Sequence, residues 1–452
     1  MKNRNRPKVA ILGAGIQGVS VALALNHAGF HVELFDRTPT PMSRTSLKGE
    51  GKLHLGYVYG NDSSLATAKI MVEGAMNFGT LLDSWLPKSI DWKRITSEPF
   101  TYAVLGDTMV PTDLLAEHYS YVDDMIESHL KRGAVYAGNR TFKRATKLRS
   151  PRLHGLSGDV TDAFLTSEVA IDPPLLAEQL VSALKTLNIA FHGNRNIVHV
   201  ERNDQGFSIT MNHVKSTTET IRADAGSGII GAVAGMTNAG MTSTGMVGTQ
   251  LSEPGATETI KADAVVNCLW DGRLEIDSTL GIKTNRTCMY RMKYAVHGTM
   301  KHRPEKPITT TFTLGPYGDV VYRNTGRVYL SWYPDCLAGL YTGIKPPQDW
   351  NKELESFAIT PEREQIIHKT TSALSEKLEY LRDLNVDSVT AGVIVAWGES
   401  DIDVHNSKLH MRHEIGVHNH DGYLSVDTGK LTTAPLFASR VVEQLTSYLK
   451  PS

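Results

Sequence analysis

Three glycines near the start of the chain, Gly13, Gly15 and Gly18, have the spacing that lets a backbone turn approach a diphosphate. The first permits a tight turn, the second leaves room for phosphate oxygens, and the third lets a helix pack closely on a strand. Asp36 follows near the expected separation of about 20 residues, where a carboxylate can accept hydrogen bonds from both ribose hydroxyls. We therefore predict a dinucleotide site.

The segments around these residues have the order that such a site requires. Residues 9–12 are a short apolar run typical of a buried strand, residues 19–25 continue as an apolar helix, and residues 31–35 form a second strand. The helix N-terminus would offer free N–H groups and partial positive charge to the diphosphate. Asp36 would repel a 2′-phosphate, although Arg37 beside it weakens that repulsion. The alternative is a glycine-rich turn without a ligand. It is disfavoured because three glycines cost chain entropy on folding and would then have no compensating function.

The turn alone does not distinguish NAD from FAD, because both contain an ADP half. The loop from Arg44 to Gly56 is rich in glycine, hydroxyl and basic residues and could wrap a second phosphate and a ribityl chain. Near the other end, residues 429–432 form a turn before an amphipathic helix over 434–449. With Lys430, the start of that helix would stabilise the negative charge of a reduced flavin. Read separately, these segments could equally be an ordinary polar loop and a docked C-terminal helix.

Together the two ends resemble the D-amino-acid oxidase-like (DAO) family of FAD-dependent oxidoreductases. The resemblance rests on the glycine turn with Asp36, on the loop from Ser46 to Gly56, on Ile171-Asp172-Pro173 heading a helix, and on the segment from Gly422 to Thr432. It implies FAD held without a covalent bond, and a strand over 197–201 that passes the adenine. The residues expected to contact the cofactor are Gly13, Gly15, Ile16, Gln17, Gly18, Asp36, Arg37, Arg44, Thr45, Ser46, His54, Val198, Gly429, Lys430, Leu431 and Thr432.

The chain departs from the family pattern after residues 262–267, which resemble the family's later strand returning to the FAD. The family usually has small residues and a glycine next, whereas this chain has Cys268-Leu269-Trp270-Asp271. The path of the backbone over the diphosphate is therefore open, and we expect Gly272 to take over the role of the missing glycine.

The substrate side is expected in a second sheet. Residues 289–333 contain several runs of alternating aromatic and β-branched residues, separated by Gly, Pro, Asn and Asp turns. An arginine fork there could bind a carboxylate in a bidentate manner. The substrate-side candidates are His54, Arg291, Arg323 and Tyr333, each of which could equally be a packing or surface residue. We assign no catalytic residue, and the histidines show no metal-ligand spacing.

Bulk composition excludes several classes of protein. The 47 basic and 48 acidic residues nearly cancel, so no basic surface points to nucleic acid. Three scattered cysteines are too few for a disulfide framework and fit a reducing compartment. No segment is apolar and long enough to span a membrane, and no leader is recognisable after the basic start. We expect a cytoplasmic protein.

These observations predict an α/β fold: a Rossmann-like FAD-binding domain and a second, mixed or antiparallel-sheet substrate domain. The first is expected over 1–100, 160–290 and 385–452, the second over 101–159 and 291–384, with a flexible glycine-rich insert at 224–258. The predicted reaction is oxidation of a small amine, amino acid or hydroxy acid by hydride transfer to flavin N5, with oxygen, a quinone or a carrier protein as electron acceptor. The alternatives are an NAD-linked dehydrogenase and a non-catalytic flavin-binding accessory protein.

Overall fold

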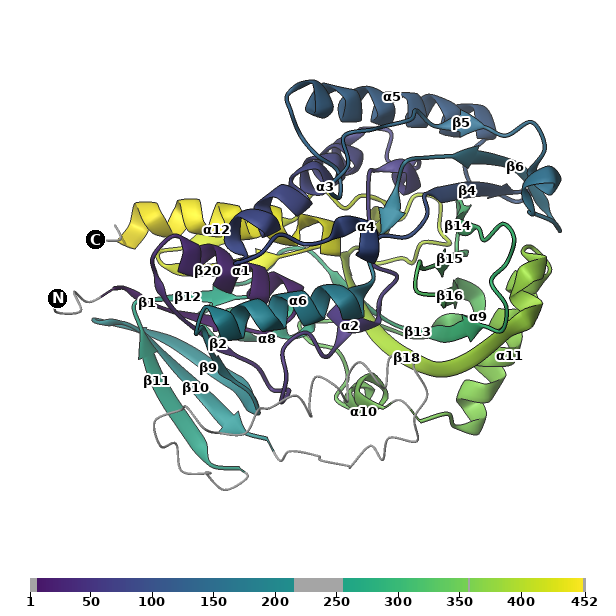
Figure 1. Cartoon of the computed structure of the whole chain (residues 1–452). Coiled ribbons are helices and arrows are strands. Elements are labelled where there is room, and N and C mark those ends of the chain that lie inside the picture. Colours follow the sequence, from purple (N-terminus) through teal and green to yellow (C-terminus); the bar gives the residue numbers. More distant parts are fainter. Residues whose placement is uncertain (1–5, 215–254, 357, 450–452) are drawn as a thin grey trace.

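The computed structural model describes residues 6–214, 255–356 and 358–449. Two large sheets lie beside each other and are joined by helices (Figure 1). The predicted insert at 224–258 lies outside the described residues up to position 254, and the last two of its residues begin a strand.

The glycine turn lies in a six-stranded sheet in the order β19-β20-β12-β1-β2-β8. All neighbours are parallel except β19, which is antiparallel to β20. The strands are β1 (Lys8–Leu12), β2 (His31–Phe35), β8 (Ala190–His192), β12 (Ala264–Asn267), β19 (Gly416–His420) and β20 (Tyr423–Asp427). The predicted Rossmann-like arrangement is confirmed, because β1, the turn, α1 (Ile16–His27) and β2 follow one another as expected.

Both faces of this sheet are covered, which explains why its strands are apolar throughout. In β1, Val9 and Ile11 face the helices, whereas Ala10 and Leu12 face a three-stranded sheet on the other side. That small sheet has the order β11-β10-β9 and consists of β9 (Arg195–Asn203), β10 (Gly206–His213) and β11 (Thr257–Ala262).

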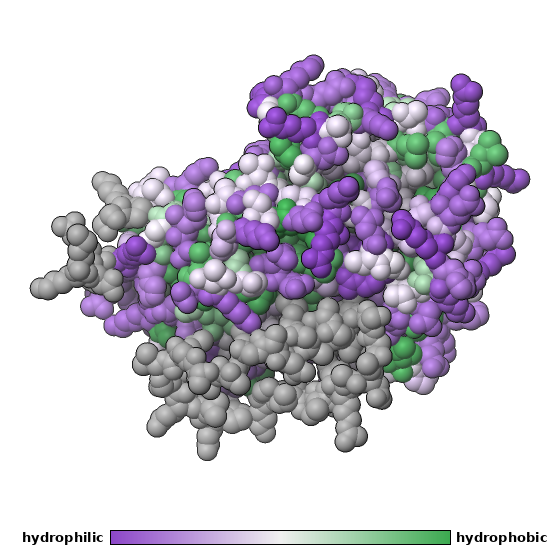
Figure 2. All heavy atoms as spheres, in the orientation of Figure 1, coloured by the Kyte–Doolittle hydropathy of each residue, from purple (hydrophilic) through white to green (hydrophobic). Residues whose placement is uncertain are grey.

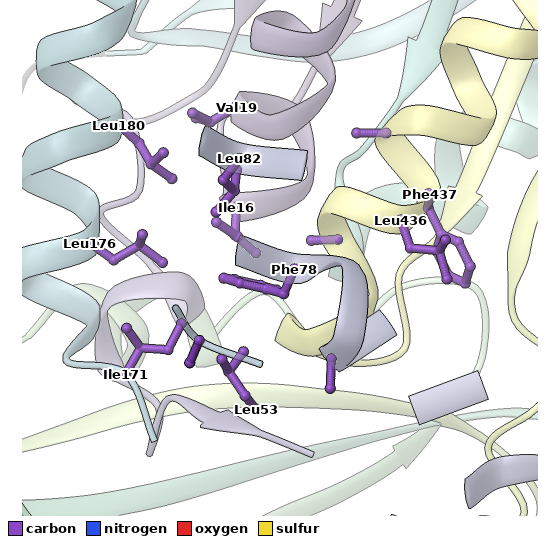
Figure 3. Packing of buried hydrophobic residues seen from close by; sticks show 14 of the residues in the cluster. Ile16, Val19, Leu53, Phe78, Leu82, Ile171, Leu176, Leu180, Leu436 and Phe437 are labelled. Atoms are coloured by element: carbon purple, nitrogen blue, oxygen red, sulfur yellow. The ribbon is translucent and has the colours of Figure 1, made fainter. Parts of the chain in front are cut away.

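Four helices form the core on the helical face. Figure 3 shows apolar side chains from all four pointing toward one another, among them Ile16, Phe78, Leu176 and Phe437. The helices are α1, α3 (Ala66–Trp85), α6 (Pro173–Thr186) and α12 (Ala434–Leu449). The last begins and ends where the sequence predicts, with Pro435 in its first turn.

The second large sheet has nine strands, in the order β17-β13-β16-β15-β14-β4-β6-β5, with β18 on β13. Its pairs are antiparallel except β4 with β14. The strands are β4 (Phe100–Leu105), β5 (Thr146–Lys147), β6 (Val160–Leu165), β13 (Cys288–Met300), β14 (Thr309–Thr313), β15 (Gly318–Tyr322), β16 (Arg327–Trp332), β17 (Leu337–Thr342) and β18 (Leu384–Trp397). One face packs on α10 (Trp350–Glu355) and α11 (Pro361–Ser375), and the other joins the core of the first sheet.

Two strands lie apart from the division of the chain that we expected. β6 and β18 fall almost wholly in ranges assigned to the FAD-binding domain, yet both form hydrogen bonds within the nine-stranded sheet. We therefore propose that the domain boundaries differ from the expected ones at β6 and β18.

Shorter elements complete the described chain: α2 (Thr45–Lys48), β3 (Lys52–Leu53), η1 (Tyr57–Tyr59), α4 (Trp92–Ile95), α5 (Thr112–Lys131), η2 (Pro151–His154), β7 (Val169–Ala170), η3 (Trp270–Gly272), α8 (Arg273–Thr279), α9 (Tyr333–Cys336), η4 (Glu379–Asp383), η5 (Lys408–His410) and η6 (Leu431–Thr433). Polar residues cover most of the face shown in Figure 2, with apolar residues scattered among them. Among the described helices, none has the length and apolar character needed to cross a bilayer.

Candidate active site

A cavity of about 410 Å³ is lined by segments from near both ends of the chain. Its wall includes Gly13, Gly15, Ile16 and Gln17 from the glycine turn and Thr428–Leu431 from the C-terminal turn. Gln17 also joins the two helices directly, because its Nε2 donates to the carbonyl oxygen of Ala434 at 3.0 Å. The two segments therefore lie at one cavity, which is the arrangement that a shared ligand requires.

The three glycines differ in what they do. Gly13 has a φ of +94°, and a Cβ there would lie 2.7 Å from the carbonyl oxygen of Cys268. A Cβ on Gly18 would lie 1.8 Å from the carbonyl oxygen of Gly13, so Gly18 serves close packing and does not line the cavity. Gly15 lies where α1 begins, and a Cβ there would approach Ser46 Oγ at 3.0 Å. The backbone amide of Ile16 donates a hydrogen bond to Ser46 Oγ at 2.9 Å.

Asp36 lies at the end of β2 with its carboxylate held in place. Oδ2 accepts from the amide of Ala14 at 2.6 Å, and Oδ1 accepts from the amide and the hydroxyl of Thr38 at 2.8 and 2.7 Å. Asp36 and Arg37 both line the cavity. The position of this carboxylate, fixed beside the glycine turn, is suited to the hydroxyls of a ribose.

Helix α10 contacts three cationic side chains at this end of the cavity. Asn351 Oδ1 accepts from Arg37 and, at 3.4 Å, from Arg44. Lys48 Nζ donates to the carbonyl oxygen of Leu354. Arg37, Arg44 and Lys48 all line the cavity. We did not expect this helix here, because it belongs to the segment assigned to the substrate side.

The departure after β12 changes the wall of the cavity. Gly272 does not take over the role of the missing glycine: it does not line the cavity, and a Cβ there would meet nothing closer than 3.7 Å. Cys268, Leu269, Trp270 and Asp271 line it instead. Trp270 Nε1 donates to the carbonyl oxygen of Val393 at 2.8 Å, and Asp271 pairs with Arg44 at 3.1 Å. A tryptophan and an ion pair thus form the wall where we expected Gly272.

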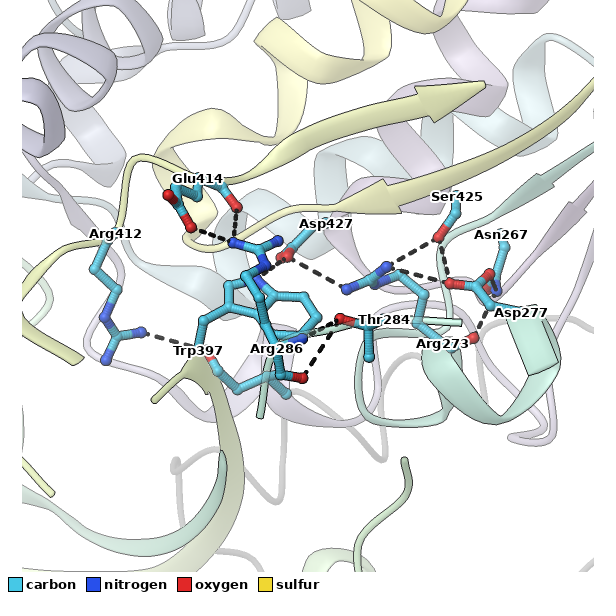
Figure 4. A network of polar contacts seen from close by, with 11 residues as sticks. Asn267, Arg273, Asp277, Thr284, Arg286, Trp397, Arg412, Glu414, Ser425 and Asp427 are labelled. Atoms are coloured by element: carbon cyan, nitrogen blue, oxygen red, sulfur yellow. Dashed lines mark hydrogen bonds and ion pairs between the residues drawn. The ribbon is translucent and has the colours of Figure 1, made fainter. Parts of the chain in front are cut away.

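A buried polar network supports the strands below the C-terminal turn (Figure 4). Arg273 bonds Asp277, Ser425 and Asp427 at 3.0–3.3 Å, and Trp397 Nε1 donates to Asp427 at 2.6 Å. These contacts fix the end of β20, from which the turn over 428–431 continues into the cavity wall.

The C-terminal turn presents Lys430 to the cavity. Gly429 has a φ of +65°, which favours glycine. Thr432 lies behind the cavity wall, where its hydroxyl accepts from the amide of His54 at 2.9 Å and so joins this turn to the early loop. Burial lowers the pKa of Lys430 to about 8, with Glu50 opposing the shift and Arg412 adding to it. The ammonium group is therefore poised to lose its proton within the working range of many enzymes.

His54 lines the cavity as a buried, neutral imidazole. Desolvation, followed by the charge of Lys430, holds its pKa well below the ordinary value. Both ring nitrogens are buried and neither has a hydrogen-bond partner among the described residues. The nearest carboxylate oxygen, from Glu50, lies 4.0 Å from Nε2. A neutral ring with a free nitrogen can accept a proton.

Two of the four substrate-side candidates, Arg291 and Tyr333, meet at the cavity and are already engaged. Arg291 Nη1 donates to the Tyr333 hydroxyl at 3.2 Å and lies 3.3 Å from Asp401 Oδ1. Tyr333 donates to Asp401 Oδ2 at 2.5 Å. Arg291 is therefore neutralised by a carboxylate that we did not single out from the sequence.

Arg412, which the sequence analysis also missed, is a buried cation with no acidic partner among the described residues. Its side chain lines the cavity, is 8% exposed and pairs with no carboxylate of the described chain. Nε donates to the carbonyl oxygen of Leu409 at 3.0 Å and Nη1 to that of Val395 at 3.3 Å. A single arginine in the irregular segment between two strands carries no pattern by which its position could have been predicted.

Two expected residues lie away from the cavity. Arg323 is turned toward the backbone, where it donates to the carbonyl oxygens of Ile171 and Glu50 at 2.7 and 3.0 Å. Its guanidinium satisfies buried carbonyls and is not offered to a substrate. Val198 lies in β9 with 37% of its surface exposed, and it does not line the cavity. Apart from Gly18 and Thr432, which lie behind the wall, the remaining expected contacts, including Thr45, Ser46 and Leu431, do line it.

Comparison with known proteins places this geometry in a family. Residues 8–394 match the family described as FAD dependent oxidoreductase (DAO). A D-amino acid dehydrogenase from Sinorhizobium medicae (strain WSM419) is 46% identical over 50 residues, a match that spans 11% of this chain and only 12% of that relative.

Solved structures resemble the whole chain at low sequence identity. Glycine oxidase from Geobacillus kaustophilus superposes with a TM-score of 0.62 at 11% identity, covering 98% of this chain and 95% of its own. Iminodiacetate oxidase from Chelativorans sp. BNC1 gives 0.60 at 13%, covering 97% and 95%. L-α-glycerophosphate oxidase from Mycoplasma pneumoniae, with FAD bound, gives 0.59 at 12%, covering 98% and 96%. These likenesses show a common fold.

The family match extends over most of the 452 residues, so the resemblance inferred from the two ends of the chain is confirmed. FAD, and not NAD, is the cofactor of this family. The chain is an enzyme that belongs to the FAD dependent oxidoreductases of the DAO family.

Proposed function

We propose that this enzyme oxidises a small amino acid or hydroxy acid, which it holds by its carboxylate. The observation that carries the proposal is Arg412, a buried cation without a described acidic partner, in the same cavity as the neutral His54. An unpaired buried charge is costly, so the arginine favours an anionic occupant.

The residues of the cavity fit FAD. At the start of α1, Gly15 and Ile16 line the cavity, where the Ile16 amide donates to Ser46 Oγ, and Asp36 lies within the same wall. At the other end, Lys430 and the start of α12 supply positive charge. Buried polar atoms without partners line the space between, among them both nitrogens of His54, Tyr59 Oη and Arg291 Nε. When bound, FAD supplies a two-electron acceptor, so that removal of hydride from a C–H beside an amine or hydroxyl gives an imine or a carbonyl compound.

The chain's own residues orient the substrate. Arg412 would bind the carboxylate with the part of its guanidinium that no described residue engages, and Lys430 would add charge from the C-terminal turn. Bidentate recognition by an arginine fixes both position and direction of a small acid. Positioning of this kind can account for several kcal/mol of a reaction barrier, on the order of 7–11 kcal/mol in the best cases.

His54 would take up the proton that leaves the substrate. Its neutral ring can accept a proton from an ammonium or hydroxyl group bound next to it, which prepares the neighbouring carbon for loss of hydride. Burial and the charges of Lys430, Lys52 and Arg412 make the free ring a weak base, and a carboxylate bound at Arg412 would offset one of these charges and strengthen the hold of the ring on the proton.

The names of related proteins agree with a substrate of this kind. Glycine oxidase, iminodiacetate oxidase and D-amino acid dehydrogenase are named for compounds that combine an amine with a carboxylate. We keep the prediction that the electron acceptor is oxygen, a quinone or a carrier protein. A cytoplasmic location also stays a proposal, supported by three free, buried cysteines.

The proposal is tested by mixing the FAD-loaded enzyme anaerobically with amino acids, amines and hydroxy acids and following the loss of flavin absorbance. Carboxylate-bearing compounds are expected to reduce the flavin, and Arg412→Gln should raise their apparent Kd by about 100-fold because a charged hydrogen-bond partner is lost.

Arg440→Gln is the matched control. Arg440 of α12 forms a partly exposed ion pair with Glu73 of α3, so this variant should change the Kd little. A carboxylate anchor would be ruled out if simple amines and amino acids reduced the flavin at equal rates and if Arg412→Gln left these rates unchanged.

A further inference from the structure

We infer that Asp401 disfavours substrates that carry a second carboxylate, by cancelling the charge of Arg291 inside the cavity. The inference rests on the proposed function, since it concerns the same substrate site. It goes further by assigning a role to a residue that does not line the cavity.

The carboxylate of Asp401 contacts two side chains that line the cavity. Oδ1 lies 3.3 Å from Arg291 Nη1, and Oδ2 accepts from the Tyr333 hydroxyl at 2.5 Å. The Arg291 and Asp401 side chains are 3% and 10% exposed, so solvent hardly screens the pair. One carboxylate therefore holds two cavity-lining side chains in place and neutralises one of them.

Several cationic side chains line this end of the cavity, and they are not equivalent. Arg291 is paired with Asp401, whereas Lys430 has Glu50 only as a more distant acidic neighbour and Lys293 lies with its Nζ 5.4 Å from the centre of the Tyr333 ring. Arg412 has no acidic partner among the described residues and lies close enough to Arg291 for each charge to be felt by the other. Of the two arginines, only Arg412 is therefore left uncompensated, and it can bind one carboxylate.

A second carboxylate placed at Arg291 would find that cation already paired. It would lose its hydration on entering the cavity and would meet Arg291 already bound by Asp401, so the desolvation cost would not be recovered. Replacing Asp401 by asparagine keeps the size of the side chain and its ability to accept from Tyr333, but leaves Arg291 uncompensated. The site of that variant should then accept a dicarboxylate.

Asp401 is thus a positioning and charge-setting residue, and its test needs no turnover. Binding of propionate and of succinate to the FAD-loaded enzyme is measured from the perturbation of the flavin absorbance band. The natural enzyme should bind propionate more tightly than succinate, and Asp401→Asn should shift the ratio of the two Kd values toward succinate by about tenfold.

A control variant tests whether the position of the charge matters. Asp403→Asn removes an equal charge from an exposed position two residues away and should leave the ratio unchanged.

An unchanged ratio in Asp401→Asn overturns the inference. So does tighter binding of succinate by the natural enzyme, which can be measured even if the variant fails to fold. If neither acid binds, both the inference and the carboxylate anchor fail. If both bind in the expected ratio but no compound reduces the flavin, the inference stands and only the proposed oxidation is overturned.

Discussion

Two buried side chains define the chemistry of the cavity at the scale of single residues: among the described residues, the His54 ring has no hydrogen-bond partner and Arg412 has no acidic partner. One is neutral because burial lowers its pKa, and the other is an arginine, which keeps its charge in proteins. A proton acceptor and an anion anchor in one cavity suit an acid that must lose a proton before it loses hydride.

Replacing His54 with glutamine should lower kcat by about 100-fold or more at neutral pH, because the amide cannot accept the proton. The defect should shrink as the pH approaches the pKa of the substrate amine, since a substrate that is already neutral needs no base. A pH profile of anaerobic flavin reduction measures both effects. His405→Gln, at an exposed position, serves as the control, and a defect of equal size at every pH would exclude a role in proton transfer.

The pKa of Lys430, about 8, predicts a pH-dependent affinity for carboxylates. Below that value the side chain carries a positive charge and attracts the anion, and above it the charge is lost, so Kd should rise as pH increases through about 8. Lys430→Arg should remove the step because arginine stays protonated, whereas Lys430→Met should give the weaker affinity throughout. A titration of propionate from pH 6 to pH 10 tests this; a flat profile in the natural enzyme would be inconsistent with it.

At the scale of elements, α10 closes the nucleotide end of the cavity over Arg37, Arg44 and Lys48. Asn351→Ala removes the oxygen that accepts from both Arg37 and Arg44. We expect FAD to dissociate several-fold faster, because these charged side chains lose a fixed partner. Flavin fluorescence after dilution reports the rate. Lys352→Ala, at an exposed position of the same helix, should leave the rate unchanged, and equal rates in both variants would remove α10 from the cofactor site.

The elements whose signals are local could be predicted from the sequence, and those that depend on distant contacts could not. The unit β1-α1-β2 and helix α12 follow from apolar periodicity, glycines and Pro435. Arg412 and α10 reach the cavity only because the two sheets meet there, which no short pattern records. Gly272 was misjudged for a related reason, since the side chain of Trp270 fills the wall through a bond to β18.

At the scale of the whole molecule, the cavity lies where two sheets of different construction share one core. The face of β4 that holds Phe100, Tyr102 and Val104 packs into the core of the first sheet, whereas Ala103 and Leu105 pack into that of the second. The cavity lining likewise comes from both. A ligand bound there would be held by both halves, which explains how a substrate wall and a cofactor cradle come to face each other.

A crystal structure of the enzyme with FAD bound tests this arrangement most directly. We predict one FAD per chain, with its diphosphate at the amide of Ile16, its ribose at Asp36 and its isoalloxazine between His54 and the turn at Gly429–Leu431. A flavin bound outside this cavity, or one that leaves either the glycine turn or the C-terminal turn without contact, would contradict the shared site.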